Sequence, residues 1–274
     1  METRFSQIIA LICANYLQRR SSFLLRRRGT VMATYVNDSL GNSIAASGYY
    51  EFEELEEVRR FLEAKQLFNS DSVFLDIGAN IGNHALYFRN DFSSIHCFEV
   101  NPRTQRLLEF NVNAFSNICV HKFGLADFNG YVEIVENDTN FGGTKIQGAS
   151  SNRSEIEVKM LDQVFTDKQR VGVIKMDVEG YEINVLRGAE STIMKNKPVV
   201  LFELHKEDFH SEAPEVVVWL KNRGYEFYAR KPSKIRLLSK LIWLLTGNTK
   251  RFHKVLKLKP SFYSMIIALP NGRI

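Results

Sequence analysis

The stretch VFLDIGANIGN at residues 73–83 constrains the fold of this chain more than any other feature. It begins as an apolar run long enough for one buried strand, and it is broken at Gly78 and Gly82. The segment at residues 83–89 then has the composition to begin a helix. A strand, a glycine turn and a helix in this order form the nucleotide-holding corner of a doubly wound α/β sheet, so we expect an α/β protein with its ligand above this turn.

The same corner narrows the class of ligand. Two glycines four residues apart let the backbone approach a ligand, and Asp76 places a carboxylate at the end of the strand. The dinucleotide fingerprint G-x-G-x-x-G is not met, because the residue two after Gly78 is Asn80. A G-x-x-x-x-G-K-[ST] loop is also missing from the sequence. The expected ligand therefore needs no phosphate cradle, which argues against an NAD-dependent oxidoreductase.

Two further acids follow at strand ends in the same unit. Residues 94–99 predict a second buried strand that ends in Glu99, a position from which a carboxylate accepts hydrogen bonds from both ribose hydroxyls. The alternative is that Glu99 is a charge at the N-terminus of the helix that Pro102 opens. Asp127 follows a third strand at residues 118–123, where it either bonds an adenine amino group or belongs to a turn.

Two later strand ends carry the residues suited to chemistry. A strand at residues 171–176 is followed by Asp177 and Glu179, at the edge of the sheet where ligands of open α/β sheets bind. Another strand ends with Glu203 and His205, whose side chains point the same way under strand alternation. An imidazole accepts a hydroxyl proton at neutral pH, so we predict His205 as the general base, with Asp177 and Glu179 orienting acceptor hydroxyls. These groups also suit Mg²⁺, a metal that is possible here but not predicted.

Taken together, these motifs resemble the FkbM-type methyltransferases, a branch of the S-adenosylmethionine-dependent class I methyltransferases. The resemblance spans residues 70–210 and rests on four motifs in the family's order: DIGANIG at 76–82, FEVNP at 98–102, IKMDVEGYE at 174–182 with LRGA at 186–189, and FELH at 202–205. Residues 262–270 resemble the family's last strand. The family usually has proline directly after the acid of the second strand, where this chain has Val100, although Pro102 still opens the helix.

The resemblance implies a fold, a cofactor and a reaction. The fold is a doubly wound, seven-stranded, mostly parallel sheet with an antiparallel last strand. The cofactor is S-adenosylmethionine, and most members with an assigned role methylate oxygen on sugars or polyketide-like products. We therefore predict an O-methyltransferase that acts on a hydroxyl of a small molecule or glycan. The cofactor-binding residues predicted from the motifs are Asp76, Gly78, Asn80, Gly82 and Glu99, with Asp127 as the candidate for the adenine group.

Other classes of function remain alternatives. A catalytically silent member that binds the cofactor or a glycan has the same motifs, since a fold does not fix an activity. A nucleic-acid methyltransferase is not favoured, because the Asn/Asp-Pro-Pro-aromatic tetrapeptide of such enzymes is missing and Asn101-Pro102 is followed by Arg103. We therefore expect no nucleic acid among the partners.

The charge of the 274-residue chain is concentrated at two segments. The net charge is +5, but residues 1–30 carry six Arg against one Glu, and residues 230–259 carry ten Lys or Arg and no acid. Clustered basic residues attract anions such as lipid head groups, nucleic acid or charged glycans, and otherwise form a solvated face. The insert at residues 230–259 has apolar residues at helical spacing, which predicts a basic amphipathic helix, either a membrane contact or a lid over the acceptor.

An apolar segment at residues 5–17 lies on one side of a predicted N-terminal helix and is too short to span a bilayer. The helix either lies on a membrane surface, through residues 5–28, or docks on the domain. The predicted organisation is a helical arm and cap at residues 1–68 and a methyltransferase domain at residues 69–274. The three cysteines match no metal or disulfide spacing, which favours the cytoplasm. Peripheral attachment to the inner face of the membrane, through residues 5–28 and 230–259, is one of the two alternatives for the basic segments. The sequence does not predict the oligomeric state.

Overall fold

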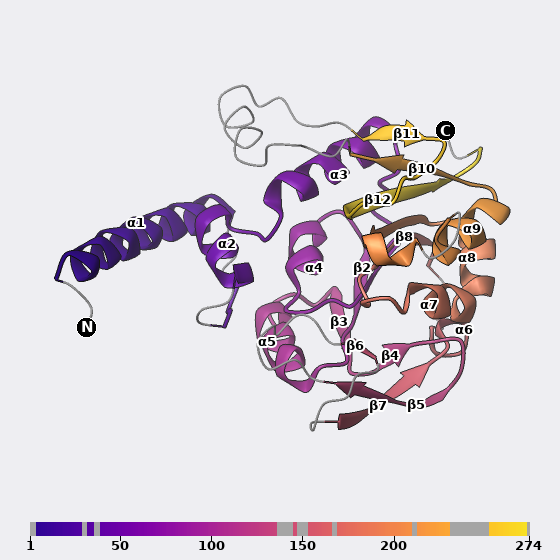
Figure 1. Cartoon of the computed structure of the whole chain (residues 1–274), viewed down its shortest axis with the longest axis horizontal. Coiled ribbons are helices and arrows are strands. Elements are labelled where there is room, and N and C mark those ends of the chain that lie inside the picture. The colour runs from indigo at the N-terminus through magenta and orange to yellow at the C-terminus, as the bar shows by residue number, and fades with distance from the viewer. Residues whose placement is uncertain are drawn as a thin grey trace.

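The computed structural model describes residues 4–28, 32–35, 39–135, 145–146, 153–165, 169–209, 213–230 and 252–272. Within these residues the chain folds around an eight-stranded sheet with the order β11-β10-β12-β9-β8-β1-β2-β3 (Figure 1). The strands are β1 (Val73–Ile77), β2 (Ser94–Phe98), β3 (Ile118–His121), β8 (Val171–Met176), β9 (Val199–Leu204), β10 (Tyr225–Ala229), β11 (His253–Val255) and β12 (Tyr263–Pro270).

Most of this sheet is parallel, as the sequence predicted. Neighbours from β3 through β2, β1 and β8 to β9 run in the same direction, whereas β12 is antiparallel to both β9 and β10. The predicted antiparallel last strand is therefore confirmed. The predicted count of seven strands is wrong by one, because β11 pairs with the edge strand β10. This strand has three residues inside the basic insert, too few to give a period-2 signal.

Helices cover both faces of the sheet and complete the doubly wound arrangement. One face packs against α3 (Phe52–Ala64), α4 (Asn83–Phe88) and α5 (Pro102–Val112). The other packs against α6 (Leu161–Val164), α7 (Glu182–Gly188), α8 (Glu190–Asn196) and α9 (Glu215–Asn222). Strand residues alternate between the two layers, so that Phe74 belongs to the first core cluster and Leu75 to the second. Every residue of β1 is buried, as a central strand of a doubly wound sheet requires.

Residues 181–194 have the apolar spacing of a single helix, but the structure divides them into two, α7 and α8, which meet at Ala189. The end of α7 is pressed against the chain that follows β4 (Gly124–Leu125). A Cβ atom on Gly188 would lie 1.8 Å from the carbonyl oxygen of Ala126, so only glycine permits this approach. A contact between segments so far apart in sequence leaves no mark on helical periodicity, and the break was missed for that reason.

A second, four-stranded sheet lies beside the main one in the lower part of Figure 1 and was not predicted as a unit. Its order is β4-β7-β5-β6, with β5 (Gly130–Val135), β6 (Lys145–Ile146) and β7 (Arg153–Lys159). Strand β7 runs antiparallel to β5 and parallel to β4. This sheet matters for function because one side of β7 contributes to the candidate site.

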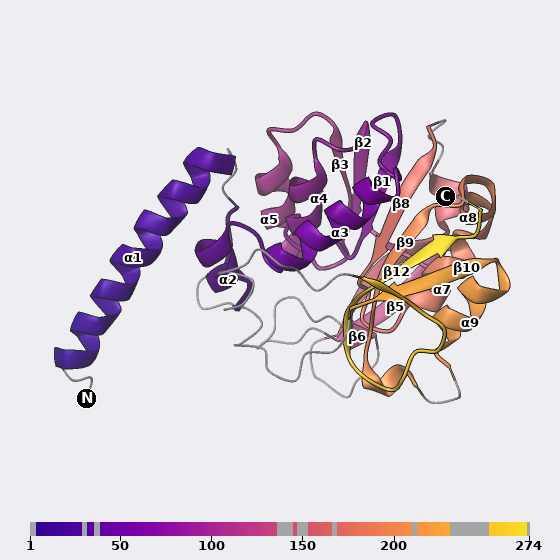
Figure 2. The ribbon, with the colours of Figure 1, turned by 90° about the horizontal axis from the view of Figure 1, so that it is seen from above.

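The N-terminal helix α1 (Arg4–Arg28) extends away from the rest of the protein and contacts α2 (Ser39–Ser47) (Figures 1 and 2). No helix among the described residues is both long enough and apolar enough to cross a membrane. Most of the predicted amphipathic insert, residues 231–251, lies outside the described residues, so its role as a lid or a membrane contact stays a prediction. The boundary at residues 68 and 69 also stays a prediction, although α3 supplies Leu55, Val58 and Leu62 to the core of the sheet.

Candidate active site

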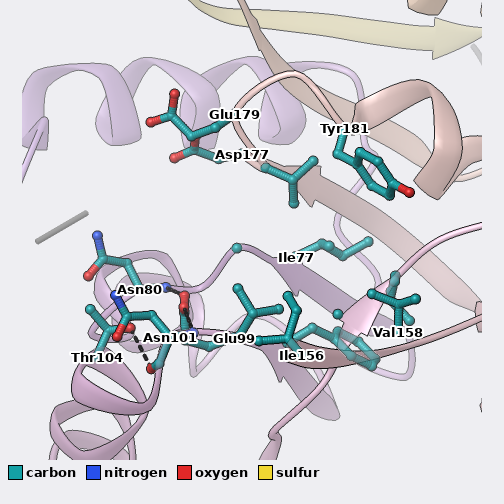
Figure 3. A pocket seen from close by; sticks show the side chains of 16 residues that line it. Ile77, Asn80, Glu99, Asn101, Thr104, Ile156, Val158, Asp177, Glu179 and Tyr181 are labelled. Carbon is teal, nitrogen blue, oxygen red and sulfur yellow. Dashed lines mark hydrogen bonds between the residues drawn. The ribbon is translucent and has the colours of Figure 1, made fainter. Parts of the chain in front are cut away.

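A cavity opens at the carboxyl ends of β1, β2 and β8, where the chain order of the sheet reverses on either side of β1. Ligands of open α/β sheets bind at this switch point. The space inside the cavity and its open mouth, solvent included, is about 770 Å³. Figure 3 shows Asn80, Glu99 and Asn101 on one side of it, and Asp177 and Tyr181 on the other.

The turn after β1 contains the two expected glycines in left-handed conformations, and close packing against neighbouring segments requires glycine at both positions. Gly78 has φ +73°, and a Cβ atom there would lie 1.9 Å from the carbonyl oxygen of Asp177. Gly82 has φ +90°, and its Cβ atom would lie 2.9 Å from Leu108 Cδ1 of α5. Gly78 and Asn80 line the cavity, whereas Gly82 is the N-cap of α4 and does not line it. The structure gives no support to a contact between Gly82 and a ligand, and that role stays a prediction.

Glu99 lies in the wall of the cavity and links two loops. Its Oε2 accepts a hydrogen bond of 2.8 Å from the backbone N–H of Asn80, and its Oε1 accepts one of 2.8 Å from that of Asn101, the N-cap of α5. Burial raises the pKa of Glu99, while the bonds from the two backbone amides act in the opposite direction. The two alternatives for this residue do not exclude each other, because a carboxylate oxygen that accepts one bond can accept a second, and ribose binding stays a prediction. Glu99 both fixes the start of α5 and offers acceptor capacity toward the cavity.

Below the turn, Lys175 holds three groups together. Its Nζ donates a hydrogen bond of 2.9 Å to the carbonyl oxygen of Gly78, and it lies 3.4 Å from Asp76 Oδ1 and 3.6 Å from Asp177 Oδ2. Burial raises the pKa of Asp76, with Lys175 opposing the shift. Burial lowers the pKa of Lys175, but the carboxylates of Asp76 and Asp177 outweigh it and leave that pKa raised. Asp76 is 0% exposed and does not line the cavity, which places it under the turn, and its predicted role in cofactor binding stays a prediction.

The apolar wall of the cavity comes largely from segments that sequence reasoning did not select. Ile156 and Val158 of β7 lie there together with Leu125 of β4 and Phe98 of β2 (Figure 3). Their signal was present, since the sequence SEIEVK at residues 154–159 alternates polar and apolar residues with the period of a strand. A flat ring of a ligand would find its apolar contacts here.

Asp127, the candidate for an adenine group, does not line the cavity. Its Oδ1 accepts a hydrogen bond of 3.2 Å from Nδ2 of Asn184 in α7. The placement gives no support to a role in cofactor binding, and that role stays a prediction.

The end of β8 brings Asp177 and Glu179 to the cavity, as the sequence predicted. Glu179 has φ +51° and Gly180 has φ +96°, so two successive residues adopt left-handed backbone conformations. The loop is held by Glu182, whose Oε1 accepts hydrogen bonds from the backbone N–H groups of Val178 at 3.3 Å and Gly180 at 3.2 Å. Strained conformations of this kind gather at functional sites.

Next to this loop, Glu203 and His205 at the end of β9 form a pair. Nε2 of His205 lies 3.1 Å from Oε1 of Glu203, which confirms that the two side chains share one side of the strand. Burial, together with the negative charges of Asp177 and Glu51, raises the pKa of Glu203 to about 8. At pH 7 this carboxyl group is mostly protonated. His205 itself does not line the cavity and packs against Phe262, with ring centroids 5.3 Å apart.

Glu51 is a further acid whose carboxyl group interacts with Asp177 and Glu203, and sequence reasoning missed it. It is the N-cap of α3, with φ +52°, and burial together with Glu54 and Asp177 raises its pKa to about 7. The preceding residue is fixed by Asn83, whose side chain accepts from the backbone N–H of Tyr50 at 2.9 Å and donates to its carbonyl oxygen at 3.1 Å. The sequence around Glu51 contains many acids, so no local signal distinguished it. We call Glu51, Asp177, Glu179 and Glu203 the acidic group.

No group of three or more His, Cys, Asp or Glu side chains is placed to hold a metal ion within the part of the chain that the structure describes. The possible Mg²⁺ site accordingly gains no support from these residues.

A doubly wound sheet with a cavity at its switch point and an acid at the end of the second strand is typical of α/β proteins that bind nucleotide-like ligands. Residues 76–227, more than half of the chain, match the family described as the Methyltransferase FkbM domain. The chain belongs to this methyltransferase family.

Relatives of known activity are similar at low identity. The chain is 27% identical over 161 residues to the hexuronic acid methyltransferase AglP of Haloferax volcanii, a match that covers 56% of this chain and 62% of that protein. It is 24% identical over 184 residues to the 2-O-methyltransferase NoeI of Sinorhizobium fredii, covering 59% and 75% of the two chains. The crystal structure of Methyltransferase FkbM from Methylobacillus flagellatus matches with a TM-score of 0.41 and 18% identity, over 73% of this chain and 44% of that one. The chain thus spans less than two thirds of the length of AglP and of the crystallised protein.

Proposed function

We propose that the protein is an S-adenosylmethionine-dependent O-methyltransferase and that its acceptor is a hydroxyl group of a sugar or glycan. The observation that carries this proposal is Glu99, buried in the cavity wall across from the acidic end of β8. Membership of the methyltransferase family supports the reaction class. The sugar acceptor is supported by the similarity to a hexuronic acid methyltransferase and a 2-O-methyltransferase.

The residues present fit the cofactor. Glu99 can accept hydrogen bonds from ribose hydroxyls, and the apolar wall with Ile156 and Val158 suits the adenine ring. Asp177 and Glu179 give the cavity a negative side, which favours a ligand that carries a positive sulfonium and an ammonium group. When bound, this cofactor supplies an electrophilic methyl group. The missing phosphate-binding loop agrees with it, because the cofactor has no phosphate.

The acidic group and His205 are the residues that we propose to orient and deprotonate the acceptor hydroxyl. Carboxylates accept hydrogen bonds from sugar hydroxyls, and this orients one oxygen for transfer. The proton of that hydroxyl must leave, and a neutral imidazole can take it up. We assign this role to His205, which Glu203 holds through the contact of 3.1 Å. Glu51 joins the residues proposed to orient the acceptor, since the charge of Asp177 acts on it and its own charge acts on Glu203.

The test combines cofactor binding with methyl transfer. We expect Glu99→Gln to weaken the binding of S-adenosylhomocysteine in calorimetry by about 10- to 100-fold, because hydrogen bonds to a charged carboxylate contribute about 1.5–3 kcal/mol. Glu109→Gln is the matched control: this acid lies in the neighbouring helix α5 and pairs with Lys122 at 2.7 Å, outside the cavity. Equal affinities of the two variants for S-adenosylhomocysteine would refute the proposed role of Glu99 in cofactor binding.

Methyl transfer is measured separately, with labelled S-adenosylmethionine and a panel of uronic acids, neutral sugars and glycan extracts. Binding of the cofactor without transfer to any hydroxyl acceptor would favour the catalytically silent alternative. His205→Ala with unchanged cofactor affinity is expected to lose turnover, and unchanged turnover would remove His205 as the base.

A further inference from the structure

The apolar stripe of α1 is not the surface that attaches this helix to the protein. The stripe consists of side chains that are 46% to 72% exposed, namely Phe5, Ile8, Ile9, Ile12, Tyr16 and Phe23. Attachment is through the other end of the helix, where Leu24 is 6% exposed and Nε of Arg20 donates to the carbonyl oxygen of Ala46 in α2 at 3.0 Å. Both views show the N-terminal end of α1 projecting from the body (Figures 1 and 2).

The two surfaces of α1 point in different directions. At 3.6 residues per turn, the six residues of the stripe fall within an arc of about 100°. Leu17, Ser21 and Leu24 fall on a separate arc centred roughly 130° away, and between residues 16 and 24 these are the partly or fully buried positions. Docking on the domain, one of the two explanations for this helix, therefore does not account for the stripe.

The charge of α1 indicates what covers the stripe. The helix has six Arg and no acidic residue, and Arg4, Arg19 and Arg20 are exposed. A second copy of α1 laid against the stripe would add positive charge and would offer no carboxylate to pair with Arg4, Arg19 or Arg20. A surface of negatively charged head groups over an apolar layer matches both properties, since it offers anions to the arginines and hydrocarbon to the stripe.

We infer that α1 binds in the plane of an anionic phospholipid surface, with the stripe inserted at the boundary of head groups and acyl chains. The helix is about 37 Å long at 1.5 Å per residue, so its whole length can lie along the membrane while the methyltransferase domain stays in the aqueous phase. The inference does not depend on the identity of the acceptor or on methyl transfer.

The test is flotation of the full chain with vesicles of phosphatidylcholine alone or mixed with phosphatidylglycerol. We expect binding to the mixed vesicles at low salt, weaker binding to the neutral ones, and a loss of binding as salt is raised. In Ile8→Ser/Ile12→Ser we expect the partition coefficient to fall by at least about 10-fold, because two apolar side chains are removed from the inserted surface. The matched control is Ala10→Ser/Ala14→Ser, which adds the same two serines at exposed positions off the stripe and should stay within about twofold of the wild type.

Three results would overturn the inference. The first is that the intact chain does not float with phosphatidylglycerol vesicles at low salt. The second is that the Ile8/Ile12 variant binds as well as the Ala10/Ala14 control. The third is that the wild type is a dimer in solution and does not bind vesicles, while the Ile8/Ile12 variant is a monomer. This result would assign the stripe to a contact between two copies of the chain. Thermal unfolding checks that both variants are folded, and binding of S-adenosylhomocysteine tests the proposed function independently of the vesicles.

Discussion

Replacing Lys175 with methionine tests the idea that a single buried cation supports the floor of the site. Lys175 is 3% exposed, and its Nζ faces Asp76 at 3.4 Å and the carbonyl oxygen of Gly78 at 2.9 Å. Methionine fills a similar volume without the charge, so the change leaves the carboxyl group of Asp76 buried without its cation. Removal of one partner from a buried ion pair costs about 3–5 kcal/mol. For a chain of this size the midpoint of thermal unfolding should fall by roughly 6–20 °C.

The pH dependence of this loss has a definite sign. Burial already raises the pKa of Asp76 in the folded protein, and without Lys175 the pKa rises further. A carboxyl group whose pKa is raised by folding stabilises the protein below its unfolded pKa of about 3.9, and this stability is lost as pH rises through the folded pKa. The Lys175→Met variant should therefore be closest to the wild type in acid and most destabilised at neutral and alkaline pH.

Urea unfolding followed by circular dichroism at several pH values measures both effects. The double variant Asp76→Asn/Lys175→Met removes the buried carboxylate as well and should recover at least about half of the lost stability at pH 7. A loss below about 1 kcal/mol for the single variant would show that Lys175 does not carry this role. No recovery in the double variant would refute the account based on an unpaired carboxylate.

Two further predictions concern the turn and the acidic group. Gly78→Ala places a Cβ atom 1.9 Å from the carbonyl oxygen of Asp177, so it should lower the free energy of unfolding by well over the roughly 1–2 kcal/mol of left-handed strain. In Gly180→Ala, where nothing lies within 4 Å of the Cβ atom, the loss should be about that strain alone. Equal unfolding free energies for the two variants would contradict the packing argument. The pKa of Glu203 is raised to about 8, so its contribution to stability is present below pH 4.5 and is lost as pH rises through about 8. Glu203→Gln should flatten this decline in the midpoint of thermal unfolding between pH 5 and 9, whereas the exposed control Glu207→Gln should keep it; parallel curves for all three proteins would count against the raised pKa.

The parts of the fold that the sequence predicted are those with a local signal. The apolar run of β1, the glycine turn and the acids at the ends of β2 and β8 all lie where alternation and turn chemistry place them. Glu99 and Asp177 could be selected because the carboxyl ends of neighbouring parallel strands meet at one edge of a sheet.

The parts that were missed depend on contacts between distant segments. Ile156 reaches the cavity because β7 returns to pair with β4 and β5, and Glu51 joins the acidic group because Asn83 fixes the preceding residue. Gly188 ends α7 early because of Ala126. Asp76 has the sequence position of a ligand contact, but Lys175, about a hundred residues later, draws it beneath the turn.

The close contact between Gly78 and the carbonyl oxygen of Asp177 has a consequence for how such an enzyme can change its acceptor. The donor turn and the end of β8 fit together without space for one methyl group, so a substitution that moves either backbone disturbs both. Glu51 and Glu203 come from α3 and β9, outside this joint. In the proposed methyltransferase, exchange of side chains at these two positions can change the acceptor preference without moving this joint, whereas position 78 must stay glycine.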